Sequence, residues 1–124
     1  GDITQDSTKN LIYNEIVKWK RNEHIKNVDV VVATPPCQGM SVANHKKRAN
    51  EIIRNSLVIE SIKMIQAIHP TFFVFENVPS FMKTICTDVD GKDKPICEAI
   101  EYGLGNDYIF SYKIINFKNY LSWQ

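Results

Sequence analysis

The sequence predicts an α/β fold built on an open sheet of mainly parallel strands joined by crossover helices. Two short apolar runs indicate strands, VDVVVA at residues 28–33 and FFVF at residues 72–75. Between them, residues 56–69 carry apolar side chains at helical spacing until Pro70 stops the helix. A strand, a helix and a strand in this order form a right-handed crossover that pairs the two strands in parallel.

The first strand leads into a candidate nucleophile. Its nearly unbroken apolar run is typical of a parallel strand covered on both faces. Pro35 and Pro36 cannot donate ladder hydrogen bonds, so the strand ends there and Cys37 follows its carboxyl end, with Gly39 leaving room for a ligand. A thiol becomes a useful nucleophile where a cation, a helix N-terminus or a base favours the thiolate. The alternative is a packed Cys37, since cysteine is often buried, but the prolines and the glycine around it argue against this.

The second strand ends in a similar way, with Glu76, Asn77, Val78 and Pro79. Neighbouring parallel strands lie about 4.8 Å apart and end along one edge of the sheet, so we expect Cys37 and Glu76 to face one cleft. Open α/β sheets bind ligands at this edge. A thiol and a carboxylate there indicate a nucleophile and an acid, whereas Glu76 alone would be read as an ordinary surface or capping carboxylate.

These two motifs, PPCQGMS at residues 35–41 and ENV at residues 76–78, resemble those of the DNA cytosine-5 methyltransferases of bacterial restriction-modification systems. GDIT at residues 1–4 is similar to the family's short acidic motif, and RNSL at residues 54–57 to its Arg-x-x-Leu stretch. Asn116, Tyr120 and Gln124 look like the start of its asparagine-tyrosine-glutamine segment. The resemblance implies a partial Rossmann-like class I methyltransferase sheet.

The resemblance also implies a reaction. The thiolate of Cys37 would add to C6 of a cytosine, Glu76 would bind and protonate the ring at N3, and C5 would accept a methyl group from S-adenosylmethionine. The substrate would be double-stranded DNA with the target cytosine rotated out of the helix. Asn77 and Val78 would support the site. No metal is implied.

Further site residues are carried over by motif. Asp2 and Ile3 would contact the adenine of the cofactor, and Pro36 and Leu57 would line its methionine end. Residues that would contact DNA lie in the stretch after the thiol: Gln38, Ser41, Lys46, Lys47 and Arg48. Cations placed against phosphates position a duplex without reading its sequence. Without the family context, the basic run that begins at His45 would be read as a solvated loop.

The chain is expected to be a partial catalytic domain spanning residues 1–124, the middle piece of a methyltransferase with little activity of its own. It lacks counterparts of the family's glycine-rich cofactor loop, of the arginine pair that follows Gln124, and of the target-recognition region. A second possibility is a non-catalytic half of a split enzyme that needs a partner chain. A third is a cysteine hydrolase that pairs Cys37 with His45 or His24.

Composition indicates a cytoplasmic protein. Basic and acidic residues number 15 and 14, for a net charge of +1, which gives no general nucleic-acid signature. No apolar run approaches the length that spans a bilayer. The three cysteines lack zinc-site spacing and are an odd number, so unpaired thiols in a reducing compartment are expected.

The remaining segments predict scaffold. Leu11, Ile12, Ile16 and Trp19 form one face of an early helix, with Ser7 as its N-cap. Polar residues 84–94 contain an Asp90-Gly91 turn, and a helix runs from about Pro95 to Gly103–Gly105.

Residues 108–115 alternate as a half-exposed strand does. In the family's sheet, another strand inserts between this strand and residues 72–75. We therefore expect the last strand to be displaced, to pair with another copy or partner chain, or to close directly onto its neighbour.

Overall fold

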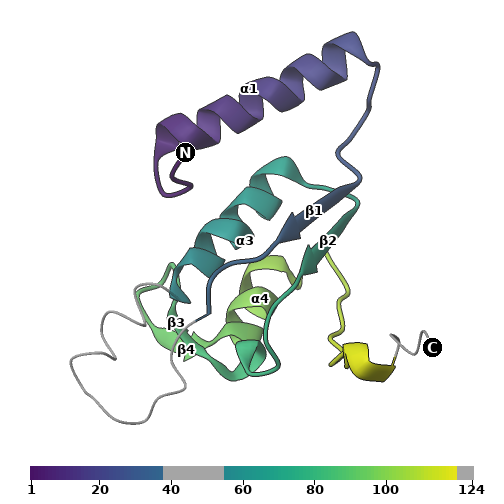
Figure 1. Cartoon of the computed structure of the whole chain (residues 1–124). Helices are drawn as coiled ribbons and strands as arrows, with labels where there is room; N and C mark the ends of the chain where they lie inside the picture. Colours follow the sequence, from purple (N-terminus) through teal and green to yellow (C-terminus); the bar gives the residue numbers. More distant parts are fainter. Residues whose placement is uncertain (38–54, 120–124) are drawn as a thin grey trace.

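The computed structural model describes residues 1–37 and 55–119 (Figure 1). The elements follow in chain order: α1 Asp6–Asn22, β1 Val30–Ala33, α3 Leu57–Ile68, β2 Phe72–Phe75, the 3₁₀ turn η1 Phe81–Lys83, β3 Ile85–Thr87, β4 Asp93–Pro95, α4 Ile96–Leu104 and the 3₁₀ turn η2 Phe117–Asn119. No helix among these residues is long and apolar enough to cross a bilayer.

The predicted crossover is confirmed. β1 and β2 pair in parallel, in a register that runs from Val30 opposite Phe72 to Ala33 opposite Phe75, and α3 connects them. The second sheet is different, since β3 and β4 form an antiparallel hairpin. The described fold is therefore α/β, but the expectation of mainly parallel strands holds only for β1 and β2.

The β1–β2 sheet has one packed face and one open face. Val31, Phe73 and Phe75 pack against the core beneath α3 and α4, whereas Val32 and Phe72 on the other face are 62% and 64% exposed. The sequence predicts a strand covered on both faces over residues 28–33. That prediction is wrong for the described residues, because alternate side chains of a strand point to opposite faces and only one face is covered here.

The core lies between α3 and α4, which pack side by side (Figure 1). Its most deeply buried side chains are apolar residues of both helices and of the hairpin: Val58, Ile65, Cys86, Ile96 and Leu104. The helices approach closely at Gly103, where an added Cβ would come within 2.6 Å of Ile62 Cγ2. The Gln66 side chain also donates to the Gly103 carbonyl at 2.8 Å. The helix predicted from about Pro95 to Gly103–Gly105 is confirmed.

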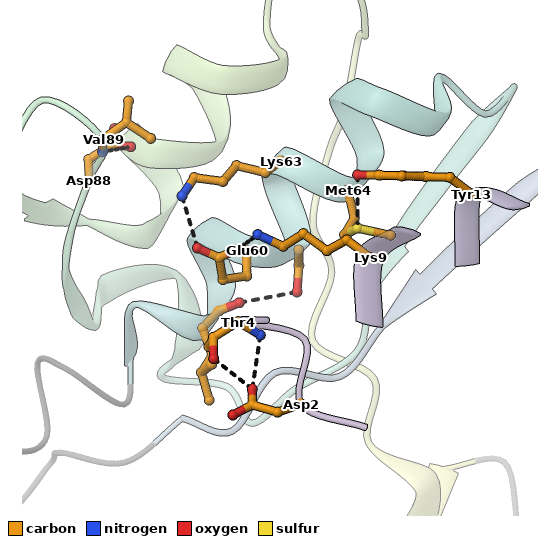
Figure 2. A network of polar contacts seen from close by, with 11 residues as sticks. Asp2, Thr4, Lys9, Tyr13, Glu60, Lys63, Met64, Asp88 and Val89 are labelled. Atoms are coloured by element: carbon orange, nitrogen blue, oxygen red, sulfur yellow. Dashed lines mark hydrogen bonds and ion pairs between the residues drawn. The ribbon is translucent and has the colours of Figure 1, made fainter. Parts of the chain in front are cut away.

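Polar contacts hold α1 against α3 more than apolar packing does (Figure 2). Lys9 Nζ lies 2.5 Å from Glu60 Oε2, and Lys63 binds the other oxygen of Glu60 at 2.9 Å. The Tyr13 hydroxyl donates to Met64 Sδ at 3.3 Å.

Two predictions for α1 need correction. The N-cap is Gln5 and not Ser7, which lies inside the first turn. The expected apolar face is not fully covered either, because Leu11 is 71% exposed. In a helix held mainly by polar contacts at its first turns, the apolar pattern alone does not decide which residues are covered.

The Asp90-Gly91 turn is confirmed, with Gly91 at a φ of 75°, and it closes the β3–β4 hairpin. The strand predicted over residues 108–115 is absent from the structure. Within the described residues no strand pairs with this segment through backbone hydrogen bonds. Side chains of the segment contact the sheet and its neighbouring loop instead. The Tyr108 hydroxyl donates to the Pro70 carbonyl at 2.7 Å, and the rings of Tyr108 and Phe110 pack on Phe73. The residues expected to form the last strand thus lie beside Phe73 of β2 without forming a strand.

Candidate active site

Hydrogen bonds join the carboxyl ends of β1 and β2 beyond the strands themselves. The Glu76 N–H donates to the Ala33 carbonyl at 3.1 Å, which extends the parallel ladder by one step. The Asn77 side chain then donates from Nδ2 to the Pro35 carbonyl at 2.6 Å. Its Oδ1 accepts from the Val78 N–H at 3.0 Å, which fixes the orientation of the amide. The prolyl turn after β1 and the ENV segment after β2 are thus held together at one edge of the sheet.

An open pocket of about 220 Å³ lies at this edge. Its lining comes from both segments: Thr34, Pro35, Glu76, Asn77 and Val78. Glu76 is exposed and Pro35 is buried, so a carboxylate reaches solvent beside a rigid apolar wall. The edge therefore offers a small hollow with a carboxyl group at its rim.

Cys37 lies just after the buried Pro35 and is half-buried against the core. Its Sγ donates to Thr84 Oγ1 at 3.2 Å, and Thr84 Oγ1 donates to the Ser80 carbonyl at 3.0 Å. Cys37 is not one of the residues that line the pocket beside Glu76. The topology brings the thiol and the carboxylate to one edge, while in this conformation the sulfur is bonded to the segment after η1.

Two of the residues expected to hold a cofactor lie in the turn before α1 and two lie near the sheet edge. Asp2 Oδ1 accepts from the Thr4 N–H at 2.9 Å and from the Thr4 hydroxyl at 2.8 Å (Figure 2). These two bonds hold the pKa of the Asp2 carboxyl below its usual value, so it stays ionised. Ile3 and Leu57 are half-buried, and Pro36 is exposed.

The Lys9–Glu60 ion pair brings the first turn of α1 beside the first turn of α3. Because α3 returns the chain from the end of β1 to the start of β2, its first turn lies on the side where the strands end. The N-terminus and the start of α3 therefore belong to the same side of the molecule as the sheet edge (Figure 1).

The residues predicted to contact DNA, Gln38, Ser41, Lys46, Lys47 and Arg48, lie outside the described residues, as do Gly39, Arg54, Tyr120 and Gln124. His45 also lies outside them. His24 is exposed in the turn after α1, and the described partner of the Cys37 thiol is a hydroxyl and not an imidazole. The hydrolase hypothesis therefore gains no support from the described residues.

Sequence reasoning does not identify Thr84 as a neighbour of the thiol. It lies 47 residues after Cys37, follows a 3₁₀ turn and belongs to neither recognised motif. No local pattern identifies such a contact, because it depends on how η1 folds back toward the end of β1. The one available signal is a hydroxyl residue a few positions beyond a strand that ends in a candidate acid.

Comparisons with known proteins match the chain to one family. The model of the C-5 cytosine-specific DNA methylase family matches residues 3–124. The chain belongs to this family.

Curated relatives point the same way. The chain is 34% identical over 123 residues to the Type II methyltransferase M1.HgaI of Avibacterium volantium. The aligned region covers 97% of the chain and 32% of the relative. The chain is 33% identical to M.XorII of Xanthomonas oryzae pv. oryzae, over 77% of the chain and 21% of the relative. With M.AquIA of Picosynechococcus it shares 30% identity, over 94% of the chain and 45% of the relative.

The chain thus spans about a third of the length of M1.HgaI and about a fifth of that of M.XorII. No solved structure shows significant similarity to it.

Proposed function

We propose that this chain is the part of a DNA (cytosine-5-)-methyltransferase that supplies the nucleophile and the acid, Cys37 and Glu76, in a Rossmann-like methyltransferase sheet. The substrate is double-stranded DNA whose target cytosine is turned out of the duplex into the hollow at the sheet edge. The remaining parts of the enzyme correspond to regions of the relatives that lie outside these 124 residues. Such an enzyme works in the cytoplasm, where a bacterial host's DNA lies, as the modifying member of a restriction-modification system.

Cys37 acts as a covalent catalyst. Its thiol loses a proton to solvent, and the resulting thiolate forms a bond from Sγ to C6 of the cytosine. The electron pair of the C5–C6 double bond moves into the ring, so C5 becomes nucleophilic. After C5 has gained its substituent, water takes the C5 proton and the electron pair of that C–H bond re-forms the C5–C6 double bond. The C6–Sγ bond breaks to release the thiolate, and N3 returns its proton to Glu76. This role requires either that the sulfur leaves its contact with Thr84 or that the cytosine ring reaches the sulfur at that position.

Glu76 supplies the proton that makes the addition possible. As a carboxylic acid at the pocket rim it donates to N3 of the cytosine while Sγ attacks C6, so negative charge does not build up on the ring. Asn77 and Val78 support this group, because the Asn77 side chain fixes the ENV segment against Pro35.

The residues present fit S-adenosylmethionine in part. Asp2 offers an ionised acceptor for hydrogen-bond donors, Ile3 and Leu57 offer partly exposed apolar surface, and Pro36 offers an exposed ring. Asp2 and Ile3 would hold the adenine, and Pro36 and Leu57 the methionine end. When bound, the cofactor supplies an electrophilic methyl group.

Contacts to the DNA backbone are proposed for Gln38, Ser41, Lys46, Lys47 and Arg48. Three of these carry positive charge, which predicts an affinity for DNA that falls as salt rises.

The observation that carries the proposal is the shared edge of β1 and β2. The two family motifs, 39 positions apart between Cys37 and Glu76, follow strands that are hydrogen-bonded neighbours and end on the same side. Open parallel sheets bind their ligands at that side.

Trapping on DNA tests the proposal. The protein encoded by the complete reading frame is incubated with S-adenosylmethionine and a duplex that carries 5-fluorocytosine, in which C5 has fluorine where the removable proton would be. The unaltered protein should form an adduct that survives denaturation. Cys37→Ser should form none, and Glu76→Gln should form it at least about 100-fold more slowly. Cys97→Ser removes another half-buried thiol and should keep the adduct. Adduct formation by Cys37→Ser would remove Cys37 from its role.

The split-enzyme alternative predicts that the reading frame encodes no further methyltransferase segment. The same protein would then trap DNA only after a partner chain is added. Adduct formation by the single purified product would rule this alternative out.

A further inference from the structure

The contact between Cys37 and Thr84 is not explained by the two family motifs. Thr84 is only 6% exposed, yet it is polar, and its single hydroxyl stands between the thiol and the Ser80 carbonyl. A buried hydroxyl is costly unless it is hydrogen-bonded, and this one is bonded on both sides. Because it is held from behind by Ser80, it gives the sulfur a rigid partner.

The directions of the two hydrogen bonds of the Thr84 hydroxyl describe the site before Cys37 loses its proton. Thr84 gives its one proton to Ser80 O, so toward Cys37 it offers only a lone pair, and the sulfur side must carry the proton. Once Cys37 loses that proton, a fixed lone pair would face a negative sulfur. A hydroxyl can rotate, however, and a bond from a hydroxyl to a thiolate is charge-assisted and stronger than one between neutral groups.

The Ser80 carbonyl makes this rotation possible at little cost. It also accepts the backbone N–H of Lys83 at 3.1 Å, so it stays hydrogen-bonded when the Thr84 proton turns away. The hydroxyl therefore has two usable positions, one bonded to Ser80 and one directed at the sulfur.

From this geometry we propose that Thr84 is a positioning residue for the nucleophile. It holds Sγ of Cys37 at the sheet edge as a thiol, and turns to donate to Sγ when the thiolate forms. No bond is made or broken other than the S–H bond, whose proton goes to solvent. The role in adduct formation rests on the proposed function, while the effect on the thiol does not.

Two variants and a matched control test this inference. Thr84→Val keeps the shape and removes the hydroxyl, and Thr84→Ser keeps a hydroxyl. Thr87→Val makes the same change in β3, where the Thr87 hydroxyl binds Asp93 Oδ1 at 2.7 Å and not the sulfur. Thermal melting of each variant reports on folding.

The first readout needs no DNA. The rate at which iodoacetamide alkylates Cys37 is measured by peptide mass spectrometry from pH 6 to pH 10, at intervals of about half a unit. The charged residues on the segments that border Cys37 among the described residues are Glu76 and Lys83, both exposed, and neither is altered. Thr84→Val should move the profile toward higher pH by about one unit, because the thiolate loses its donor. Thr84→Ser and Thr87→Val should leave it in place.

The second readout is the adduct with 5-fluorocytosine DNA. Thr84→Val should form it about 10-fold more slowly, the loss expected for one hydrogen bond of about 1.4 kcal/mol, and Thr84→Ser should restore the rate. An unmoved alkylation profile in Thr84→Val, or an equal shift in Thr87→Val, would overturn the inference. So would a serine variant that behaves like valine. If the unaltered protein forms no adduct, the proposed function fails, and the alkylation profile still decides the role of Thr84 toward the thiol.

Discussion

The Asn77 side chain donates to the main-chain carbonyl of Pro35 at 2.6 Å and so fastens the end of β2 to the turn that presents Cys37. This bond joins residues 42 positions apart, and the amide is oriented by the Val78 N–H bound to its Oδ1. A side chain that donates to the Pro35 carbonyl and also accepts from the Val78 N–H must carry both a donor and an acceptor. An amide has both, which explains an asparagine directly after Glu76.

Asn77→Asp should therefore weaken the site more than the fold. The carboxylate keeps the acceptor for Val78 but places a negative oxygen against the Pro35 carbonyl. We expect unfolding to become easier by about 1–3 kcal/mol, the cost of a buried acceptor that loses its donor. Adduct formation should fall about 10-fold or more, because the thiol segment is no longer held. Urea unfolding and the trapping assay measure the two effects. Asn10→Asp, on the exposed side of α1, is the control and should change neither.

The three thiols should differ sharply in reactivity. Cys86 is fully buried in the core, and burial raises its pKa to about 11. At pH 8, native protein should therefore be alkylated at Cys37 and Cys97, both half-buried, while Cys86 reacts only after unfolding. Pulsed iodoacetamide labelling with peptide mass spectrometry checks this. Rapid labelling of Cys86 in the native protein would contradict its place in the core.

The raised pKa of Cys86 also means that the folded protein should lose stability at high pH. The pKa of Cys86 is raised in the folded state relative to the ordinary value of 9.0. Its contribution to stability is therefore fully present below about pH 9 and is lost as the pH rises through about 11. Cys86→Ala would remove this dependence, and Cys97→Ala would keep it. Urea unfolding at pH 8 and at pH 10.5 measures both.

Much of this fold could be predicted because its signals are local. The paired strands, the crossover helix and α4 follow from apolar spacing and from prolines and glycines at their ends. The β3–β4 hairpin is not predicted apart from its turn, since each strand has only three residues and β4 is polar. The strand expected over residues 108–115 failed for a different reason. Its alternating pattern is real, but a strand needs a neighbour with free backbone groups, and periodicity does not reveal whether one is present.

The candidate site divides in the same way. The shared edge that brings Pro35 and Asn77 together follows from topology, because parallel neighbours end on one side. The direction of the Cys37 sulfur does not follow, since it depends on Thr84 and on the turn η1. The predictions that concern the DNA-contacting residues fall outside the described residues and stay predictions.

The ion pair between α1 and α3 should respond to acid and to salt. Partial burial tends to raise the pKa of Glu60, but hydrogen bonds from Lys63 and Lys9 outweigh it, so the pKa lies below the ordinary value of 4.5. A lowered carboxyl pKa gives stability that is present above about pH 4.5 and is lost as the pH falls through the folded-state value. The pKa of Lys9 is raised by its bond to Glu60, so on the alkaline side the contact persists up to the ordinary lysine value of 10.5 and is lost above it.

Glu60→Gln should therefore lower stability at pH 7 by about 1 kcal/mol at most, because this pair is partly solvated. The difference from the unaltered protein should shrink at pH 3 and at high salt. Thermal melting at pH 3 and pH 7, each at about 0.05 M and 1 M salt, measures this. Glu15→Gln removes a carboxylate that is 52% exposed and lies 3.7 Å from Lys18, and it should have almost no effect. A difference that persists at pH 3 would show that Glu60 acts through packing and not through charge.

Gly103 sets the distance between α3 and α4. A methyl group added there would lie 2.6 Å from Ile62 Cγ2, closer than side-chain carbons approach each other, so the Ile62 side chain or one of the helices must shift. Overpacking of this kind costs about 1–3 kcal/mol, and alanine returns about 1 kcal/mol through its higher helix propensity. We expect Gly103→Ala to destabilise the protein by up to about 2 kcal/mol in urea unfolding.

A second substitution separates this clash from other causes. Ile62→Leu removes the methyl group at Cγ2 and keeps the side-chain volume. The variant that carries both Gly103→Ala and Ile62→Leu should therefore lose less unfolding free energy than the sum of the two single losses, by at least about 0.5 kcal/mol. Gly91→Ala serves as a contrast, because nothing lies within 4 Å of the added carbon and its cost comes only from the φ of 75°. That cost should not change when Ile62 is replaced. Strict additivity between positions 103 and 62 would mean that the helices have room to separate, and that Gly103 is not what holds them close.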